Sequence, residues 1–292
     1  MNSYSNAGTG GENPVIGFLL GTGVVSQIVL FIVLSVVLYI FMMILEVAYT
    51  SFRQIGGTRV DILPETVSAK DKMYTFIQDP SSSIAKTLPY SDNERTGIEF
   101  SYSFFLWINP SSFKMEDGLM HIMHKGHPKC YPLMSPGVFL HSNANTLRIY
   151  QNSSDTWNNY IDVDGIPVKK WVHVVIVARA NSIEVYLNGN LTKKLKLDKG
   201  VLYQNYGDLY LFNPRIFVEN GNTIKSIGAN NMFKVDGTFD GKLSRLSYFS
   251  YALTYTEIQG LNVQGANPQT VTQAEDAPPY FTDNWWVNSY SQ

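Results

Sequence analysis

The sequence has few cysteines and no excess of basic residues, and each absence argues against a class of protein. It contains one cysteine in 292 residues, so no disulfide can form within the chain, as is usual in a reducing compartment. It has no excess of basic residues either, because 22 Lys and Arg face 24 Asp and Glu. Proteins that bind nucleic acid generally neutralise phosphates with a basic surface. We therefore expect no nucleic-acid partner.

Charged side chains are absent from one long segment, residues 15–45. A helix crosses the hydrocarbon core of a bilayer with about 20 apolar residues, and the most apolar part, residues 24–45, is long enough. A cleavable signal peptide would be shorter and would follow a basic residue, so we predict a retained transmembrane helix in a lipid bilayer. Its expected anchor residues are Val24, Leu30, Phe31, Leu34, Leu38, Phe41 and Leu45.

The basic residues beside this helix predict its orientation. The polar tail, residues 1–14, has no Lys or Arg, whereas Arg53 and Arg59 follow the helix closely. Positive residues favour the cytosolic side, so we expect a single-pass membrane protein whose C-terminal part is cytosolic. The glycosylation sequons at Asn152 and Asn190 would then be chance tripeptides, and they would matter only outside the cytosol.

The composition changes along the rest of the chain. Residues 46–93 are polar, contain DPSSS and LPYSDN, and predict a linker with one short element near residues 73–77. Residues 94–263 alternate short β-branched and aromatic runs with Gly, Asn, Asp and Pro, which is typical of an all-β domain. Residues 264–292 form an aromatic C-terminal tail.

Strands and turns within residues 94–263 predict an antiparallel β-sandwich. Apolar side chains recur at every second position from Ile98 to Ile108, which places them on one face of a strand. Three further strands are expected over residues 171–178, 183–187 and 191–197, and Asn188-Gly189 between the last two suits a type I′ turn. A short helix is expected after Thr254, with a capping box to Glu257 and a stop at Gly260.

These pieces, in this order, resemble the laminin-G-like members of the concanavalin A-like lectin and glucanase superfamily. The resemblance is carried by IEFSYSFFLWINP, IMHKG, GVFLHSNANTLRIY, KKWVHVVIVARANSIEVYLNG and FDGKLSRLSYFSYALTYTEIQGL. It implies a jelly-roll β-sandwich after the transmembrane helix. The segments HPKCYPLMSPGVFL and APPYFTDNWWVNSY are also similar to membrane-anchored proteins of large DNA viruses that infect algae. That likeness implies a minor capsid protein on the viral inner membrane, with its domain facing the capsid proteins.

Catalytic patterns are missing from the sequence. Related glucanases use a Glu-x-Asp-x-Glu strand, and retaining glycosidases need two carboxylates about 5–5.5 Å apart, but Asp162 and Asp164 have no glutamate beside them. No Gly-x-Ser-x-Gly elbow frames a serine nucleophile. Asp236, Asp240 and the pair Glu116-Asp117 are scattered through turns, where Asp is common without calcium. We expect no enzyme activity and no cofactor.

Exposed aromatic residues are the candidate contact sites. Trp157, in the polar loop NSSDTWNNY, and nearby Tyr160 could stack on a sugar, contact a protein partner or fold back over the sandwich. Trp285 and Trp286 in the tail could dock on their own domain, on a neighbouring subunit or at the membrane interface.

The stretch HIMHKGHPKC places three histidines and the cysteine at intervals of three. In a regular strand, His121 and His124 would point to opposite faces, so we expect no metal site here. The leading function is a structural link between a membrane and protein partners, with a membrane-tethered lectin as the alternative. A glycanase is the least favoured.

Overall fold

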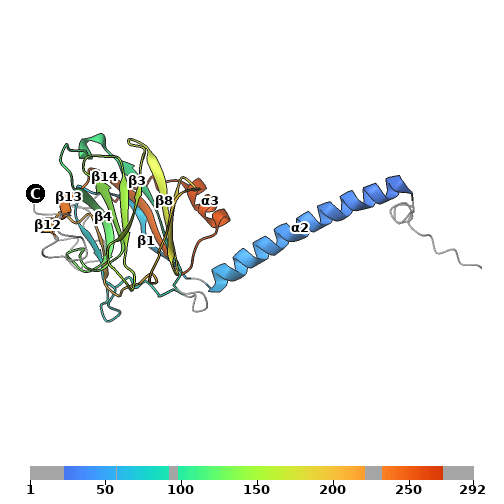
Figure 1. The fold of residues 1–292 in the computed structure, drawn as a ribbon, viewed down its shortest axis with the longest axis horizontal. Helices are drawn as coiled ribbons and strands as arrows, with labels where there is room; N and C mark the ends of the chain where they lie inside the picture. The colour runs from blue at the N-terminus through green and yellow to red at the C-terminus, as the bar shows by residue number, and fades with distance from the viewer. Residues whose placement is uncertain (1–22, 57, 92–97, 221–231, 272–292) are drawn as a thin grey trace, which may run out of the picture. The chain divides into compact units, whose positions relative to one another are not determined.

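The computed structural model describes residues 23–56, 58–91, 98–220 and 232–271. The chain divides into two compact units, Met1–Gly56 and Gly57–Gln292. Among the described residues, the first contains a long helix, and the second contains a β-sandwich and the short helix α3 (Tyr255–Gln264) (Figure 1).

Helix α2 (Val24–Gly56) contains the apolar segment. Its stretch Val24–Ala48 has 25 residues with a mean hydropathy of 3.2 and no buried side chain in its most apolar window. By length and composition it can cross a membrane. The helix runs beyond the predicted end at Leu45, because no proline or glycine interrupts it before Gly56. The predicted anchor residues have exposed side chains: Val24, Leu30, Phe31, Leu34, Leu38, Phe41 and Leu45.

One layer of the sandwich is a six-stranded sheet in which every neighbouring pair is antiparallel. The Asn188-Gly189 turn joins its last two strands, and both residues have positive φ (48° and 82°), as predicted for a type I′ turn. In spatial order the strands are β1 (Arg59–Ser68), β14 (Gly241–Phe249), β3 (Phe100–Ile108), β8 (Trp171–Arg179), β9 (Ser182–Leu187) and β10 (Asn190–Lys196).

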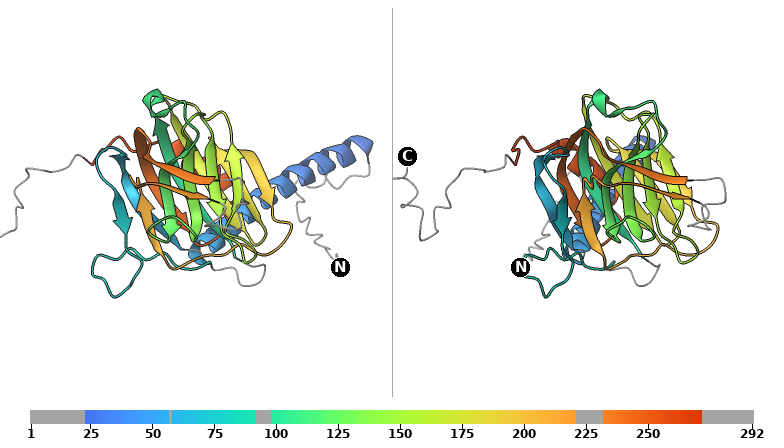
Figure 2. Two further views of the ribbon diagram at one scale, coloured as in Figure 1. Left: turned by 60° about the vertical axis from the view of Figure 1, so that its left-hand side comes forward. Right: turned by 90° about the vertical axis from the view of Figure 1, so that its left-hand side faces the viewer.

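The other layer is an eight-stranded sheet (Figure 2). A 3₁₀ turn, η1 (Pro110–Ser112), follows β3 before the chain enters it. Its main path is β12 (Ile216–Asn220), β13 (Met232–Thr238), β4 (Leu119–Gly126), β5 (Met134–His141), β6 (Leu147–Gln151) and β7 (Asn159–Val163). Two more strands, β11 (Asp208–Leu211) and β2 (Tyr74–Phe76), continue from β4.

Strand β4 has two partners along one edge. Leu119 and His121 pair with β13, whereas residues 123–126 pair with β11. On its other edge the register with β5 slips between His121 and Met123. The strand therefore contains a β-bulge where its neighbours change, which turns the side chains after the bulge to the other face.

The core lies between the two sheets. In β3 the side chains of Phe100, Tyr102, Phe104, Leu106 and Ile108 are buried in it, as the period of two predicts. Each large side chain buried there contributes about 1.5–3 kcal/mol to stability. The predicted β-sandwich preceded by an apolar helix is confirmed, and its described strand pairs are antiparallel except for the parallel pair of β13 and β4.

Helix α3 (Tyr255–Gln264) covers the outer face of the six-stranded sheet. Thr254 and Glu257 form the predicted capping box. The predicted stop at Gly260 is wrong, because the helix continues to Gly265, where φ is 66°. Ile258 is buried against the sheet, and this packing offsets the cost of one glycine inside a helix, about 1 kcal/mol.

The structure departs from the linker predicted over residues 46–93. That segment includes the end of α2, and β1 and β2 within it are strands of the two sheets. β1 is an edge strand that contains Pro64, and its register slips twice between Asp61 and Thr66. Proline and bulges are tolerated at sheet edges, but they remove the regular alternation that indicates a strand.

Candidate functional site

A hollow of about 360 Å³ lies on the outer face of the eight-stranded sheet. Its floor comes from β6, where Leu147 and Ile149 point into the core and Arg148 and Tyr150 therefore point outward. Three parts of the chain complete the walls: residues 117–119 at the start of β4, the segment 157–160, and residues 232–234 of β13.

Aromatic rings form one wall of this hollow. Trp157 is half-buried, and its ring centroid lies 4.9 Å from that of Tyr131, 5.8 Å from Phe233 and 6.1 Å from Tyr150. Its loop thus folds back over the sheet, and the same ring also lines the hollow. Tyr160 is 41% exposed. The structure therefore brings together the two predicted contact residues, Trp157 and Tyr160.

Charged side chains lie beside these rings. The guanidinium of Arg148 is 4.1 Å from the centroid of the Tyr160 ring. It also donates two hydrogen bonds to Asp162, at 2.7 and 2.6 Å. Burial opposes ionisation of Asp162, but the hydrogen bonds and charge of Arg148 outweigh it and lower the pKa of that carboxyl below its ordinary value. Arg148 and Asp162 are thus a fixed ion pair.

The carboxylates near this hollow are not arranged as a glycosidase pair. Asp162 is bound to Arg148, and Asp164 accepts a hydrogen bond from Thr146 and lies 3.6 Å from Lys193. Among the described residues that line the hollow, Asp117 is the one acid. Most glycosidases hydrolyse the glycosidic bond with two facing carboxylates. The described carboxylates at this hollow do not form such a pair.

Two of the acids considered for calcium, Asp240 and Asp236, are bound by protein groups. Asp240 accepts hydrogen bonds from Asn109 and Ser111 and lies 2.8 Å from the ammonium of Lys70. Asp236 lies 3.3 Å from the ammonium of Lys234. A lysine at each carboxylate occupies the position that a cation would take.

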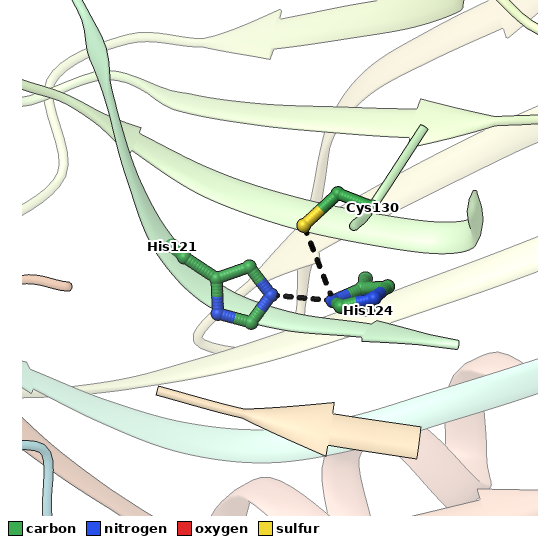
Figure 3. A group of neighbouring side chains, drawn as sticks. All are labelled: His121, His124 and Cys130. Carbon is green, nitrogen blue, oxygen red and sulfur yellow. Dashed lines mark hydrogen bonds between the residues drawn. The ribbon is translucent and has the colours of Figure 1, made fainter. Parts of the chain in front are cut away.

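The histidine stretch has a different geometry from the predicted one. His121 and His124 point to the same face of β4, with Nε2 of His121 2.6 Å from Nδ1 of His124 (Figure 3). The prediction of opposite faces is wrong because the bulge between His121 and Met123 inserts an extra residue. The Sγ atom of Cys130 lies 3.6 Å from the same Nδ1. All three side chains are buried, and their ligand atoms lie within 4.8 Å of one another.

Hydrogen bonds assign the protons in this cluster. Nδ1 of His121 accepts from the backbone N–H of Asn213 at 3.0 Å, so the ring carries its proton on Nε2 and donates it to His124. Nε2 of His124 lies 2.9 Å from the carbonyl oxygen of His127, so it donates there, and Nδ1 of His124 accepts. A metal on Nε2 of His121 would move a proton to Nδ1, against the Asn213 N–H. The donor set therefore does not fit a metal ion.

Ionisation of the cluster agrees with this assignment. Burial lowers the pKa of His124 to about 4 and that of His121 well below its ordinary value. Burial also raises the pKa of the Cys130 thiol to about 12. In the absence of a metal ion the three groups are therefore neutral at physiological pH, and a metal would have to displace the proton of the Cys130 thiol.

Sequence reasoning found part of the candidate site. It singled out Trp157 and Tyr160 but missed Arg148, His141 and Lys234. The alternation of LRIY and YIDVD in neighbouring strands is the signal that places Arg148 and Asp162 on one outer face. Trp285 and Trp286 lie outside the described residues.

Comparisons with known proteins identify the family. A model described as the concanavalin A-like lectin/glucanases superfamily matches residues 87–259, more than half of the chain. No curated protein sequence matches.

Several solved structures are similar at low sequence identity. The binding domain of botulinum neurotoxin DC in complex with SialylT has a TM-score of 0.40 and 16% identity over 60% of this chain and 38% of that chain. The receptor binding domain of botulinum neurotoxin D has a TM-score of 0.44 and 12% identity, over 72% and 44%. Trypanosoma rangeli sialidase has a TM-score of 0.39 and 13% identity, over 57% and 23%. This chain spans less than half the length of each.

Proposed function

Because the chain belongs to the concanavalin A-like lectin/glucanases superfamily, we propose that its sandwich is a non-catalytic carbohydrate-binding module and that helix α2 tethers it to a membrane. One observation carries the proposal: the hollow on the eight-stranded sheet combines the rings of Trp157 and Tyr160 with hydrogen-bonding side chains. Sugars present apolar ring faces edged by hydroxyl groups, and such a mixed surface complements them.

The polar part of the wall supports a hydroxyl-rich ligand. Nε2 of His141 is buried and has no hydrogen-bond partner in the described structure. It lies 3.7 Å from Asp162, beyond hydrogen-bond distance. An unpaired buried polar atom costs about 1–3 kcal/mol, so a ligand hydroxyl that reached it would recover part of that energy.

A glycan-binding experiment tests the proposal. The full chain in lipid nanodiscs is applied to a glycan microarray, and hits are measured by calorimetry. Tyr160→Ala is expected to weaken binding about tenfold, since loss of one aromatic contact costs about 1 kcal/mol or slightly more. Tyr255→Ala, an exposed tyrosine of α3 on the other sheet, is the matched control and is expected to bind normally. The absence of binding to any glycan would refute the proposal.

The role of a minor capsid protein between a viral membrane and the capsid shell remains a prediction from the resemblance. An exposed apolar helix serves either function. The two functions differ in topology, because glycan recognition at a cell surface requires the sandwich on the non-cytosolic side. That side is opposite to the one predicted from Arg53 and Arg59. A measurement of which side of the membrane the sandwich lies on therefore distinguishes the glycan-binding function from the capsid function.

A further inference from the structure

The cations beside the proposed sugar site are already neutralised. Arg148 is bound by both oxygens of Asp162. The ammonium of Lys234 lies 3.3 Å from Glu116 and 3.3 Å from Asp236. An acidic ligand would have to compete for these cations with carboxylates that already bind them.

The charged side chains that line the hollow are Arg148, Lys234 and Asp117. Counted together with Asp162, Glu116 and Asp236, the three carboxylates that bind the two cations, the local charge is negative. Since like charges repel and a partly buried ion pair is costly to break, a sialylated or sulfated sugar is disfavoured. A neutral sugar meets no such penalty.

A second hollow of about 370 Å³ shares one wall with the first. Trp157 lines both. The other described lining residues of the second hollow include Pro132, Ser154 and Tyr203, and none of them is charged. Tyr203 is 44% exposed. The second hollow therefore offers aromatic and hydroxyl groups without an electrostatic preference.

We propose that the ligand is an uncharged oligosaccharide long enough to occupy both hollows, with Trp157 between its sugar units. This inference rests on the proposed carbohydrate-binding function and adds its ligand class and length. The rings of Tyr160 and Tyr203 border the two halves of the site, and Asp117 disfavours acidic sugars.

The test compares matched glycans on the full chain in nanodiscs. A neutral series of increasing length is measured beside the same glycans carrying sialic acid or sulfate. We expect at least about tenfold weaker binding of the acidic forms, stronger binding as length increases, and little effect of added salt. Tyr203→Ala should weaken binding of the longer glycans and leave the shortest unchanged, whereas Tyr160→Ala should weaken all of them.

A charge reversal tests the electrostatic argument directly. Asp117 is exposed, so Asp117→Lys should leave the fold intact and improve binding of acidic glycans severalfold. Asp71→Lys reverses the charge of another exposed residue, outside both hollows, and should change nothing. Preference of the unaltered chain for acidic glycans, or equal affinity for the shortest and longer glycans, would overturn this inference alone. Failure to bind any glycan would overturn the proposed function as well.

Discussion

Single residues in β4 show why a local pattern gave the wrong geometry. The period of two holds for a regular strand, and it placed His121 and His124 on opposite faces. The bulge that brings them together lies where β13 and β11 succeed each other along β4. Those partners come from residues 208–238, far along the chain, so the local sequence could not predict it.

Acid is expected to destabilise the sandwich through these residues. His124 is neutral in the folded state with a pKa of about 4, whereas an unfolded histidine titrates near 6.5. The unfolded state therefore binds more protons below pH 6.5, and stability is lost as the pH falls from there toward 4. His124 alone should lower the free energy of unfolding by about 2 kcal/mol at about pH 5 relative to neutral pH. Buried His173, whose pKa burial also lowers to about 4, adds to this loss. Denaturation of the detergent-solubilised chain at about pH 7.5 and 5, followed by tryptophan fluorescence, measures it.

The control for this prediction is an exposed histidine. His127 is exposed, so His127→Gln should keep the full pH dependence, whereas His124→Gln should reduce it. A stability that does not change between these two pH values would contradict neutral, buried histidines.

Metal ions are expected to leave the His121–His124–Cys130 cluster unaffected. The Asn213 N–H already bonds Nδ1 of His121, and burial raises the pKa of the Cys130 thiol to about 12, so a metal would have to displace both the Asn213 N–H and the thiol proton. Removal of metal by a chelator, or addition of Zn²⁺, should therefore not change the melting temperature. A rise with Zn²⁺ that disappears in Cys130→Ser would show that the cluster binds metal.

At the scale of elements, the start of helix α3 could be predicted from the local sequence, whereas its end depends on packing against the six-stranded sheet. The capping box at Thr254 was visible in the sequence because it depends on two residues three apart. The helix end was not, because the contact of Ile258 with the six-stranded sheet extends it through Gly260. Long-range packing, absent from a local pattern, overrides one glycine.

Gly260→Ala is expected to stabilise the sandwich by about 0.5–1 kcal/mol. Gly260 is exposed within α3, and a Cβ built on it has no atom within 4 Å. Alanine therefore adds helix propensity without a clash.

Thr254→Ala should have the opposite effect, a loss of about 1 kcal/mol in the free energy of unfolding, because it removes the side-chain cap of the Glu257 N–H. Chemical denaturation of both variants measures this, and a destabilised Gly260→Ala would show that the helix stops earlier.

At the scale of the whole molecule, the two sheets and the apolar helix were predictable, while the candidate site was only partly so. Strand periodicity and turn residues indicate that the strands form two packed antiparallel sheets. The hollow, however, joins residues 117–119, 148–160 and 232–234, which the topology brings together from distant parts of the chain. Trp157 and Tyr160 could be identified because an aromatic residue in a polar loop is unusual, but Lys234 has no such local signal.

Orientation in the membrane is the last property of the whole molecule that a single modification can report. Asn152 is buried, and its side chain bonds the N–H of Met134 and the carbonyl oxygens of Pro132 and Trp157. Asn190, at the start of edge strand β10, is exposed.

If the sandwich lies on the non-cytosolic side, as glycan recognition requires, expression in a eukaryotic cell should add one glycan, at Asn190 and not at Asn152. The measurement is a shift in gel mobility that disappears after enzymatic deglycosylation and is absent in Asn190→Gln. Asn152 is left unchanged in this test, because its replacement would remove the hydrogen bonds of its buried side chain and disturb the fold. Protease added to sealed membranes provides the independent control. An unmodified chain whose sandwich is cut from the cytosolic side would contradict the glycan-binding topology, and it would favour the capsid-facing one predicted from Arg53 and Arg59.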